Sequence, residues 1–136
     1  MTAFPNEKFR LYGEGSLSKS NEDYSIECLP HFEIENLDNL SVDLFYNSCS
    51  FSEMDEASAK NYLSAIERTC RNYFMHDNHD VEFKFHQPDN TYSTNIIGSK
   101  LIPNPGLFKL IFKKFRTHGL PEDKDFTHYE YLYKRL

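Results

Sequence analysis

The stretch SEMDEASAKNYLSAIERTCRNYFM, residues 52–75, has the spacing of a long amphipathic helix. Ser52 can cap its start, and the acidic residues of its first turn suit the positive end of a helix dipole. Apolar residues then recur at steps of three and four and form one stripe: Ala59, Tyr62, Leu63, Ile66, Cys70, Tyr73 and Phe74. A stripe of this kind packs on a sheet, which places Cys70 in the core.

Strand patterns, in which apolar and polar residues alternate, stand on both sides of this helix. We expect strands at residues 9–12, 24–28, 32–46 (two strands), 79–86 and 126–136, with a short one at 95–97. A second helix is predicted from Asn104-Pro105 to a stop at Gly119. Because the strands do not alternate regularly with helices, the predicted fold is α+β: an antiparallel β-sheet of about five or six strands with two helices packed on one face.

Length and composition predict a single globular domain that spans residues 1–136. Hydrophobic residues make up 39% of the chain, which is too many for a disordered protein. No segment has the length and apolarity of a signal peptide or a membrane span, so a cytoplasmic protein is expected. The three cysteines cannot all pair and are expected as free thiols, with Cys28 and Cys70 buried.

The segment HFEIENLDNLSVDLFY, residues 31–46, predicts a β-hairpin around a three-residue loop at 37–39. An odd loop sets Ile34 on the same inner face as Val42 and Leu44. The outer face then carries opposed carboxylates beside an apolar anchor, and repulsion across the ladder would be relieved by a cationic partner. The predicted partner-binding residues are Glu33, Glu35, Asp38, Asp43 and Phe45.

Charge points to the same function. Residues 1–98 hold 17 acidic against 7 basic residues, which argues against nucleic acid and favours a basic protein partner. Familiar nucleotide, hydrolase, zinc and calcium motifs are absent from the sequence. The predicted function is therefore a non-enzymatic protein-binding module, comparable to inhibitors or immunity proteins, that presents the acidic hairpin to a basic protein and needs no cofactor.

Histidines suggest a different class of function. The stretch MHDNHDVEFKFH, residues 75–86, could supply a metal site from His76, His79 and Asp80, or a catalytic base at His86. The alternative function is therefore a small His-dependent enzyme or metal-dependent hydrolase. The expectation remains solvated histidines and no metal, because 77–78 is turn-prone and His86 would lie roughly 20 Å along an extended strand from Asp80.

The second predicted helix offers a further alternative. Lys109, Lys113 and Arg116 would form a basic stripe beside a wide apolar face, which is typical of helices that lie on anionic membranes. Stable membrane association is nevertheless not expected, because the helix ends have the caps of a globular helix. The tyrosine-rich strand near the C-terminus, with Tyr129, Tyr131 and Tyr133 on one face, could pair in a homodimer.

Overall fold

The computed structural model describes residues 9–13, 26–86, 88–116 and 128–136. These form an α+β structure in two compact units, residues 1–37 and 38–136. The strand expected at 126–136 and the second helix expected up to 119 lie partly outside the described residues. Whether the two units act as one domain stays a prediction, and each unit is described by itself.

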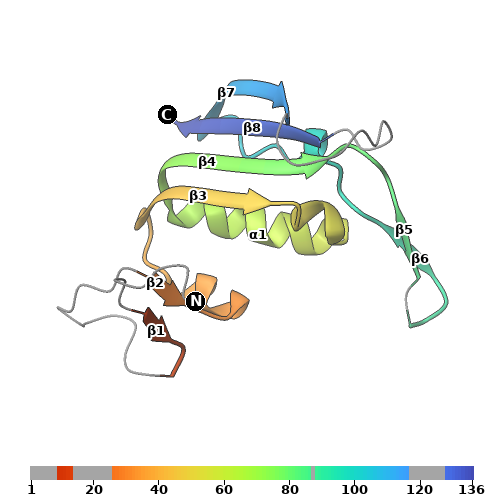
Figure 1. Ribbon diagram of the computed structural model, residues 1–136, viewed down its shortest axis with the longest axis horizontal. Coiled ribbons are helices and arrows are strands. Elements are labelled where there is room, and N and C mark those ends of the chain that lie inside the picture. The colour runs from red at the N-terminus through yellow and green to blue at the C-terminus, as the bar shows by residue number, and fades with distance from the viewer. Residues whose placement is uncertain (1–8, 14–25, 87, 117–127) are drawn as a thin grey trace, which may run out of the picture. The chain divides into compact units, whose positions relative to one another are not determined.

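The described residues of the first unit form a small parallel sheet and one short helix. Strands β1 (Phe9–Leu11) and β2 (Ile26–Cys28) pair in parallel, and the 3-10 helix η1 (His31–Asn36) follows (Figure 1). Gly13 follows β1 at a φ of +91°, a conformation that glycine adopts without strain. Both strands lie within the ranges predicted for them, but Cys28 is exposed rather than buried.

The second unit is built on a mixed four-stranded sheet in the order β3-β4-β8-β7. Its strands are β3 (Val42–Ser48), β4 (Cys70–His79), β7 (Phe108–Phe115) and β8 (His128–Arg135). Strands β3 and β4 are parallel, whereas β4, β8 and β7 pair antiparallel in turn. The prediction of a purely antiparallel sheet is therefore wrong, because a helical crossover returns the chain to start β4 at the same end as β3.

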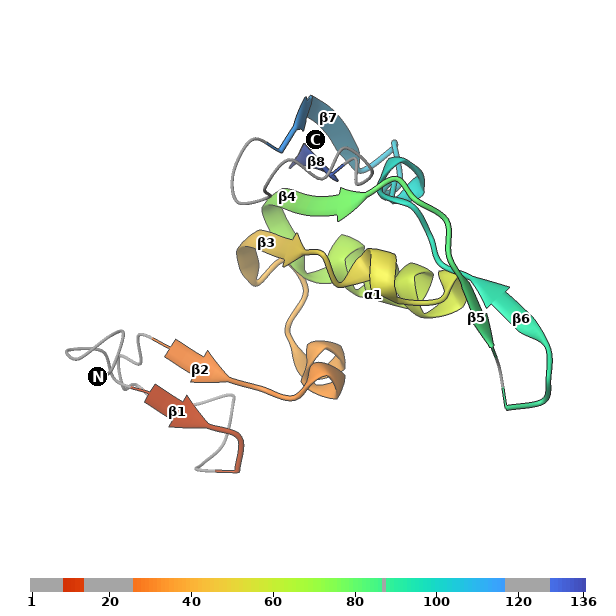
Figure 2. The same ribbon diagram turned by 45° about the vertical axis from the view of Figure 1, so that its right-hand side comes forward.

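That crossover is α1 (Glu56–Thr69), which runs along β3 and β4 in both views (Figures 1 and 2). Asp55, not Ser52, caps it, because its Oδ1 accepts a hydrogen bond from the Ser58 amide at 3.0 Å. Of the predicted stripe, Ala59, Tyr62, Leu63 and Ile66 lie on α1 and pack in the core with the buried Cys70 and Phe74 of β4, whereas Tyr73 is 39% exposed. The helix is shorter than predicted, since Cys70 already has extended backbone angles and opens β4.

The predicted second helix is wrong over residues 108–115, which form the edge strand β7. Phenylalanine and isoleucine favour strands, and an irregularity between Leu110 and Phe112 lets this sequence pair with β8 despite its adjacent apolar residues. The amphipathic membrane helix considered above therefore does not form. Among the described residues, no helix has the length and apolarity needed to cross a bilayer.

The predicted hairpin at 31–46 is also wrong. Its first half forms η1, and its second half is β3, which pairs in parallel with β4 instead. The tyrosine-rich strand is β8, and its Tyr131 and Tyr133 side chains are buried in the core, with exposed fractions of 3% and 4%. Because β8 pairs with β4 on one side and β7 on the other, it has no free edge for the homodimer considered above.

The remaining described elements are short. A two-stranded hairpin joins β5 (Lys84–His86) to β6 (Tyr92–Thr94), so the strand expected at 79–86 is divided between the end of β4 and β5. Instead of the strand expected at 95–97, Asn95 forms an isolated bridge with Asp55. The 3-10 helices η2 (Phe51–Glu53) and η3 (Gly98–Lys100) lie in the connections, and η2 contributes Phe51 to the core.

Candidate functional site

The acidic residues predicted to bind a partner do not share a strand face. Glu33 is buried in η1, where it accepts a hydrogen bond from the Asn36 amide at 2.9 Å, and Glu35 is exposed on the same helix. Asp38 is exposed ahead of β3. Asp43 is exposed on β3, whereas Phe45 packs against the core. The opposed carboxylates of the predicted hairpin are therefore not formed, and a partner-binding role for these residues stays a prediction.

Two of the three residues suggested as metal ligands face other partners. His76 is fully buried and stacks on Tyr131 with ring centroids 4.5 Å apart. Asp80 accepts a hydrogen bond from the Ser99 amide at 2.6 Å and lies 3.5 Å from the Lys113 ammonium. Among the described residues, no group of three or more His, Cys, Asp or Glu side chains is placed to hold a metal ion.

His86, the base considered for an enzyme, lies on β5 in the short hairpin, where its ring meets Tyr92 edge to face. Among the described residues, its ring packs against neither Tyr129 nor Tyr131, since Tyr129 meets Phe115 and Tyr131 instead. His79 is different, because it ends the central strand β4 beside a second buried imidazole from β8.

A group of polar side chains does gather at one edge of the main sheet. Parallel strands β3 and β4 both end there, β7 ends there, and β8 begins there (Figure 1). In open sheets that contain parallel strands, ligands bind outside the carboxyl ends of those strands. Here we name this group the carboxyl-edge cluster, which consists of Cys49, Glu53, Asp77, His79, Arg116 and His128.

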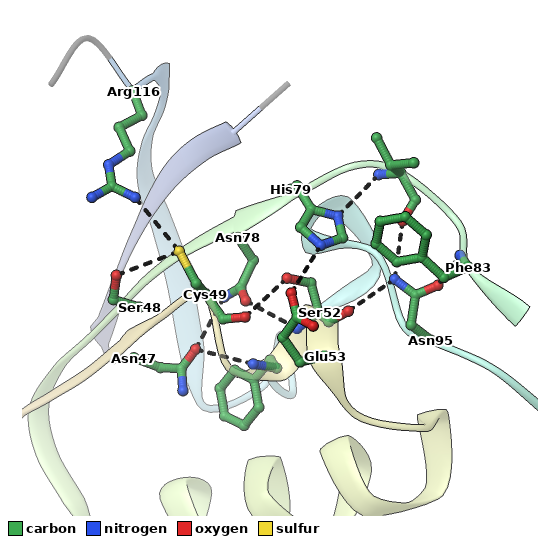
Figure 3. A network of polar contacts seen from close by, with 12 residues as sticks. Asn47, Ser48, Cys49, Ser52, Glu53, Asn78, His79, Phe83, Asn95 and Arg116 are labelled. Carbon is green, nitrogen blue, oxygen red and sulfur yellow. Dashed lines mark hydrogen bonds and ion pairs between the residues drawn. The ribbon is translucent and has the colours of Figure 1, made fainter. Parts of the chain in front are cut away.

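A partly buried ion pair anchors the cluster. Asp77, 1% exposed, places Oδ2 2.8 Å from Nη1 of Arg116 and accepts a hydrogen bond from the Ser48 hydroxyl at 3.2 Å. The same guanidinium nitrogen lies 3.5 Å from Sγ of Cys49, which has a φ of +61° directly after β3 (Figure 3). Burial acts to lower the pKa of Arg116, but Asp77 and Cys49 outweigh it and raise that pKa. Arg116 is thus a permanent positive charge at the edge.

Two imidazoles stand next to this pair. His79 and His128 are 3% and 9% exposed, and their rings meet edge to face at 5.5 Å. His79 Nδ1 accepts a weak hydrogen bond from the Val81 amide, so the neutral ring carries its hydrogen on Nε2, 3.6 Å from a Glu53 carboxylate oxygen. Burial lowers the pKa of His128 below 6.5, which makes its ring a neutral proton acceptor at pH 7.

Three of these buried atoms have no hydrogen-bond partner among the described residues. They are Oδ1 of Asp77, Nε2 of His79 and Nδ1 of His128. Most buried polar atoms in proteins are paired, and an unpaired one calls for an explanation such as a catalytic role. Three of them in adjacent side chains mark the carboxyl-edge cluster as the candidate site.

Buried amides hold the loops that carry the cluster (Figure 3). The Asn78 side chain accepts a hydrogen bond from the Ser52 amide at 3.0 Å and donates one to Asn47 at 3.1 Å. The Asn95 side chain donates to the carbonyl oxygens of Ser52 and Val81. Because these bonds join the loop after β3 to the loop after β4, the positions of Glu53 and His79 are fixed relative to each other.

Of the cluster, sequence reasoning proposed His79 as a metal ligand and Arg116 as part of a membrane-binding stripe. The other four residues, Cys49, Glu53, Asp77 and His128, stand at three separate places in the chain and match no motif. One local signal was present, since Asp77, Asn78 and His79 continue a strand pattern with polar residues in the middle of the chain. Burial of such residues indicates a network or a site, whereas the same residues in a turn would be solvated.

No protein-family model matches the chain, and a search of curated proteins found no significant match. The functional argument therefore depends on the residues of the cluster.

Proposed function

We propose that the protein is an enzyme that binds a small hydroxyl-bearing ligand at the carboxyl-edge cluster and removes a proton from it. The observation that supports this most is the set of unpaired buried atoms on Asp77, His79 and His128. Leaving such an atom unpaired costs about 1–3 kcal/mol, a cost that bound ligand would remove.

The class of ligand follows from what these atoms can accept. An ionised carboxylate oxygen accepts hydrogen bonds and cannot donate them, so Asp77 Oδ1 requires a donor. A neutral imidazole presents one accepting nitrogen, which suits the same kind of ligand at His128. Compounds with several O–H groups meet both requirements, whereas purely anionic or apolar compounds meet neither.

His128 is the proposed base. Its lowered pKa keeps the ring neutral at pH 7, and it accepts the proton of a ligand hydroxyl as that oxygen becomes negative. Arg116 supplies positive charge beside the developing oxyanion, in a partly buried position where such an interaction is stronger than in water. The His79 ring, whose Nδ1 accepts the Val81 amide hydrogen, donates a hydrogen bond from Nε2 to a second ligand oxygen in place of the Glu53 carboxylate, which lies 3.6 Å from the same nitrogen.

This proposal is a form of the histidine-dependent enzyme considered from sequence, with the base moved from His86 to His128. It can be tested by NMR on the full chain with labelled histidine rings, titrated with glycerol, ribose and glucose as probes. At least one probe should shift the His128 and His79 ring signals saturably, with a Kd of about 10 mM or below.

Two variants locate the site. His128→Gln leaves the Asp77–Arg116 pair in place and should weaken binding of the active probe at least ~10-fold, equivalent to ~1.4 kcal/mol. His86→Gln, in the exposed hairpin, is the matched control and should bind as the parent does. If none of the three probes produces a saturable shift up to about 0.1 M, or if both variants bind like the parent, the proposal is wrong.

A further inference from the structure

The two edges of the main sheet differ in how they are protected. Natural edge strands are usually guarded by charges, proline or bulges against pairing with another chain. Strand β7 has these features, since it carries three lysines and an irregular register near Ile111. Strand β3, with the sequence VDLFYNS, carries a single charged residue, Asp43, and neither lysine nor proline. Within the described part of the chain, β3 pairs with β4 alone.

Apolar side chains next to this free edge are exposed. Leu44 and Tyr46 are paired in register with Tyr73 and Met75, which flank the core residue Phe74 along β4. Because side chains alternate across a strand, Leu44 and Tyr46 point away from α1. Their exposed fractions are 53% and 54%. Within the described residues, this edge therefore combines backbone groups that have no partner strand with an apolar surface.

We propose that β3 pairs antiparallel with β3 of a second copy of this chain, about a twofold axis at Phe45. In this register Leu44 of one copy lies opposite Tyr46 of the other on the face away from α1, so that two exposed apolar side chains meet. Asp43 lies opposite Asn47, a carboxylate against an amide, and no like charges are opposed. The strand is thus complementary to itself.

Other twofold registers fit less well. An axis at Leu44 would set Asp43 opposite Phe45 and leave the end of β3 beyond Tyr46 without a partner strand residue. Only the axis at Phe45 pairs all seven residues of the strand. It also continues the apolar row of Tyr46, Met75 and Leu132 across the axis, since these three are register neighbours on adjacent strands. The result is an eight-stranded sheet with no edge at its centre.

The mass of the full chain in solution tests this proposal. Light scattering across about 1–100 μM should show a species of twice the chain mass of 16.1 kDa, in a concentration-dependent equilibrium. Leu44→Lys places a charge on the free edge and should shift the equilibrium to monomer by at least ~10-fold in Kd. Ile111→Lys is the matched control, because Ile111 is a half-exposed aliphatic residue of the other edge strand, and it should dimerise like the parent.

Cross-linking tests the register independently of how Leu44→Lys folds. In a Cys28→Ser background, chains with Leu44→Cys mixed with chains carrying Tyr46→Cys should form a disulfide-linked dimer on mild oxidation, and each alone should form much less. A parent that stays monomeric at ~100 μM refutes the proposal. So does a Leu44→Lys chain that dimerises as the parent does, or a mixture that cross-links no more than its components. If β3 pairs with a strand of another protein instead, the parent chain alone stays monomeric.

Discussion

Acid should destabilise the fold through His76, and His76→Phe should remove that sensitivity. The ring is fully buried and stacked on Tyr131, and its Nε2 has no partner among the described residues. Burial lowers the pKa of His76 from 6.5 to about 4, with the charge of Asp80 opposing this in part. A proton therefore binds the unfolded chain at a higher pH than it binds the folded protein.

The size and sign of the effect follow from linkage. Above pH 6.5 the ring is neutral in both states, so the full stability is present. As the pH falls from 6.5 to 4 the unfolded state alone gains a proton, and the free energy of unfolding falls. A pKa difference of about 2.5 corresponds to a loss of ~3 kcal/mol, which is a large part of the 5–15 kcal/mol that holds a typical domain together.

Urea unfolding at pH 7 and pH 4 measures this loss. Between these two pH values the parent should lose ~3 kcal/mol more than His76→Phe, and carboxyl groups that also titrate cancel in the comparison. His86→Gln removes an exposed histidine and should behave like the parent. Equal losses in the parent and in His76→Phe would show that the buried ring does not carry the acid sensitivity.

Three further outcomes are expected. Asp55→Ala removes the cap of α1 and should lower the free energy of unfolding, measured in urea, by ~1 kcal/mol. A loss below a few tenths of a kcal/mol would mean that another group caps the helix. Cys28 should react with an alkylating probe at once and Cys70 only after unfolding, since burial also raises the pKa of Cys70; fast labelling of Cys70 would contradict its place in the core. Gly98→Ala should cost about 1–3 kcal/mol by thermal or urea unfolding, because a Cβ there would lie 3.0 Å from the carbonyl oxygen of Asn78, and a neutral substitution would show that this contact relaxes freely.

Local pattern was sufficient for the elements whose period is unambiguous. The stripe from Ala59 to Ile66 recurs at helical spacing for about two turns, and no strand could place those residues on one side. The tyrosines of β8 recur at every second position, which only a strand places on one face. These two segments therefore determined α1 and β8 from sequence alone, along with the α+β class of the fold.

Tertiary structure decided the segments whose pattern fits more than one element. The sequence FKLIFKKF at 108–115 has apolar residues at helical spacing, but it also pairs as a strand once an irregularity offsets its adjacent apolar residues. Backbone hydrogen bonds with β8 favour the strand over the helix for this segment. In the same way β3 pairs with β4, because α1 places this long and largely buried strand alongside it, whereas the residues expected to form the other half of the hairpin at 31–46 form η1 instead.

The candidate site depended on tertiary structure almost entirely. Its residues come from the ends of β3, β4 and β7, from η2 and from the start of β8, and no short stretch contains more than two of them. Sequence spacing carries information about neighbours along one helix or strand, but not about which strand ends meet at one edge of a sheet. The strand order β3-β4-β8-β7 determines which strand ends lie together, and it places His128 beside His79 and Arg116 beside Asp77.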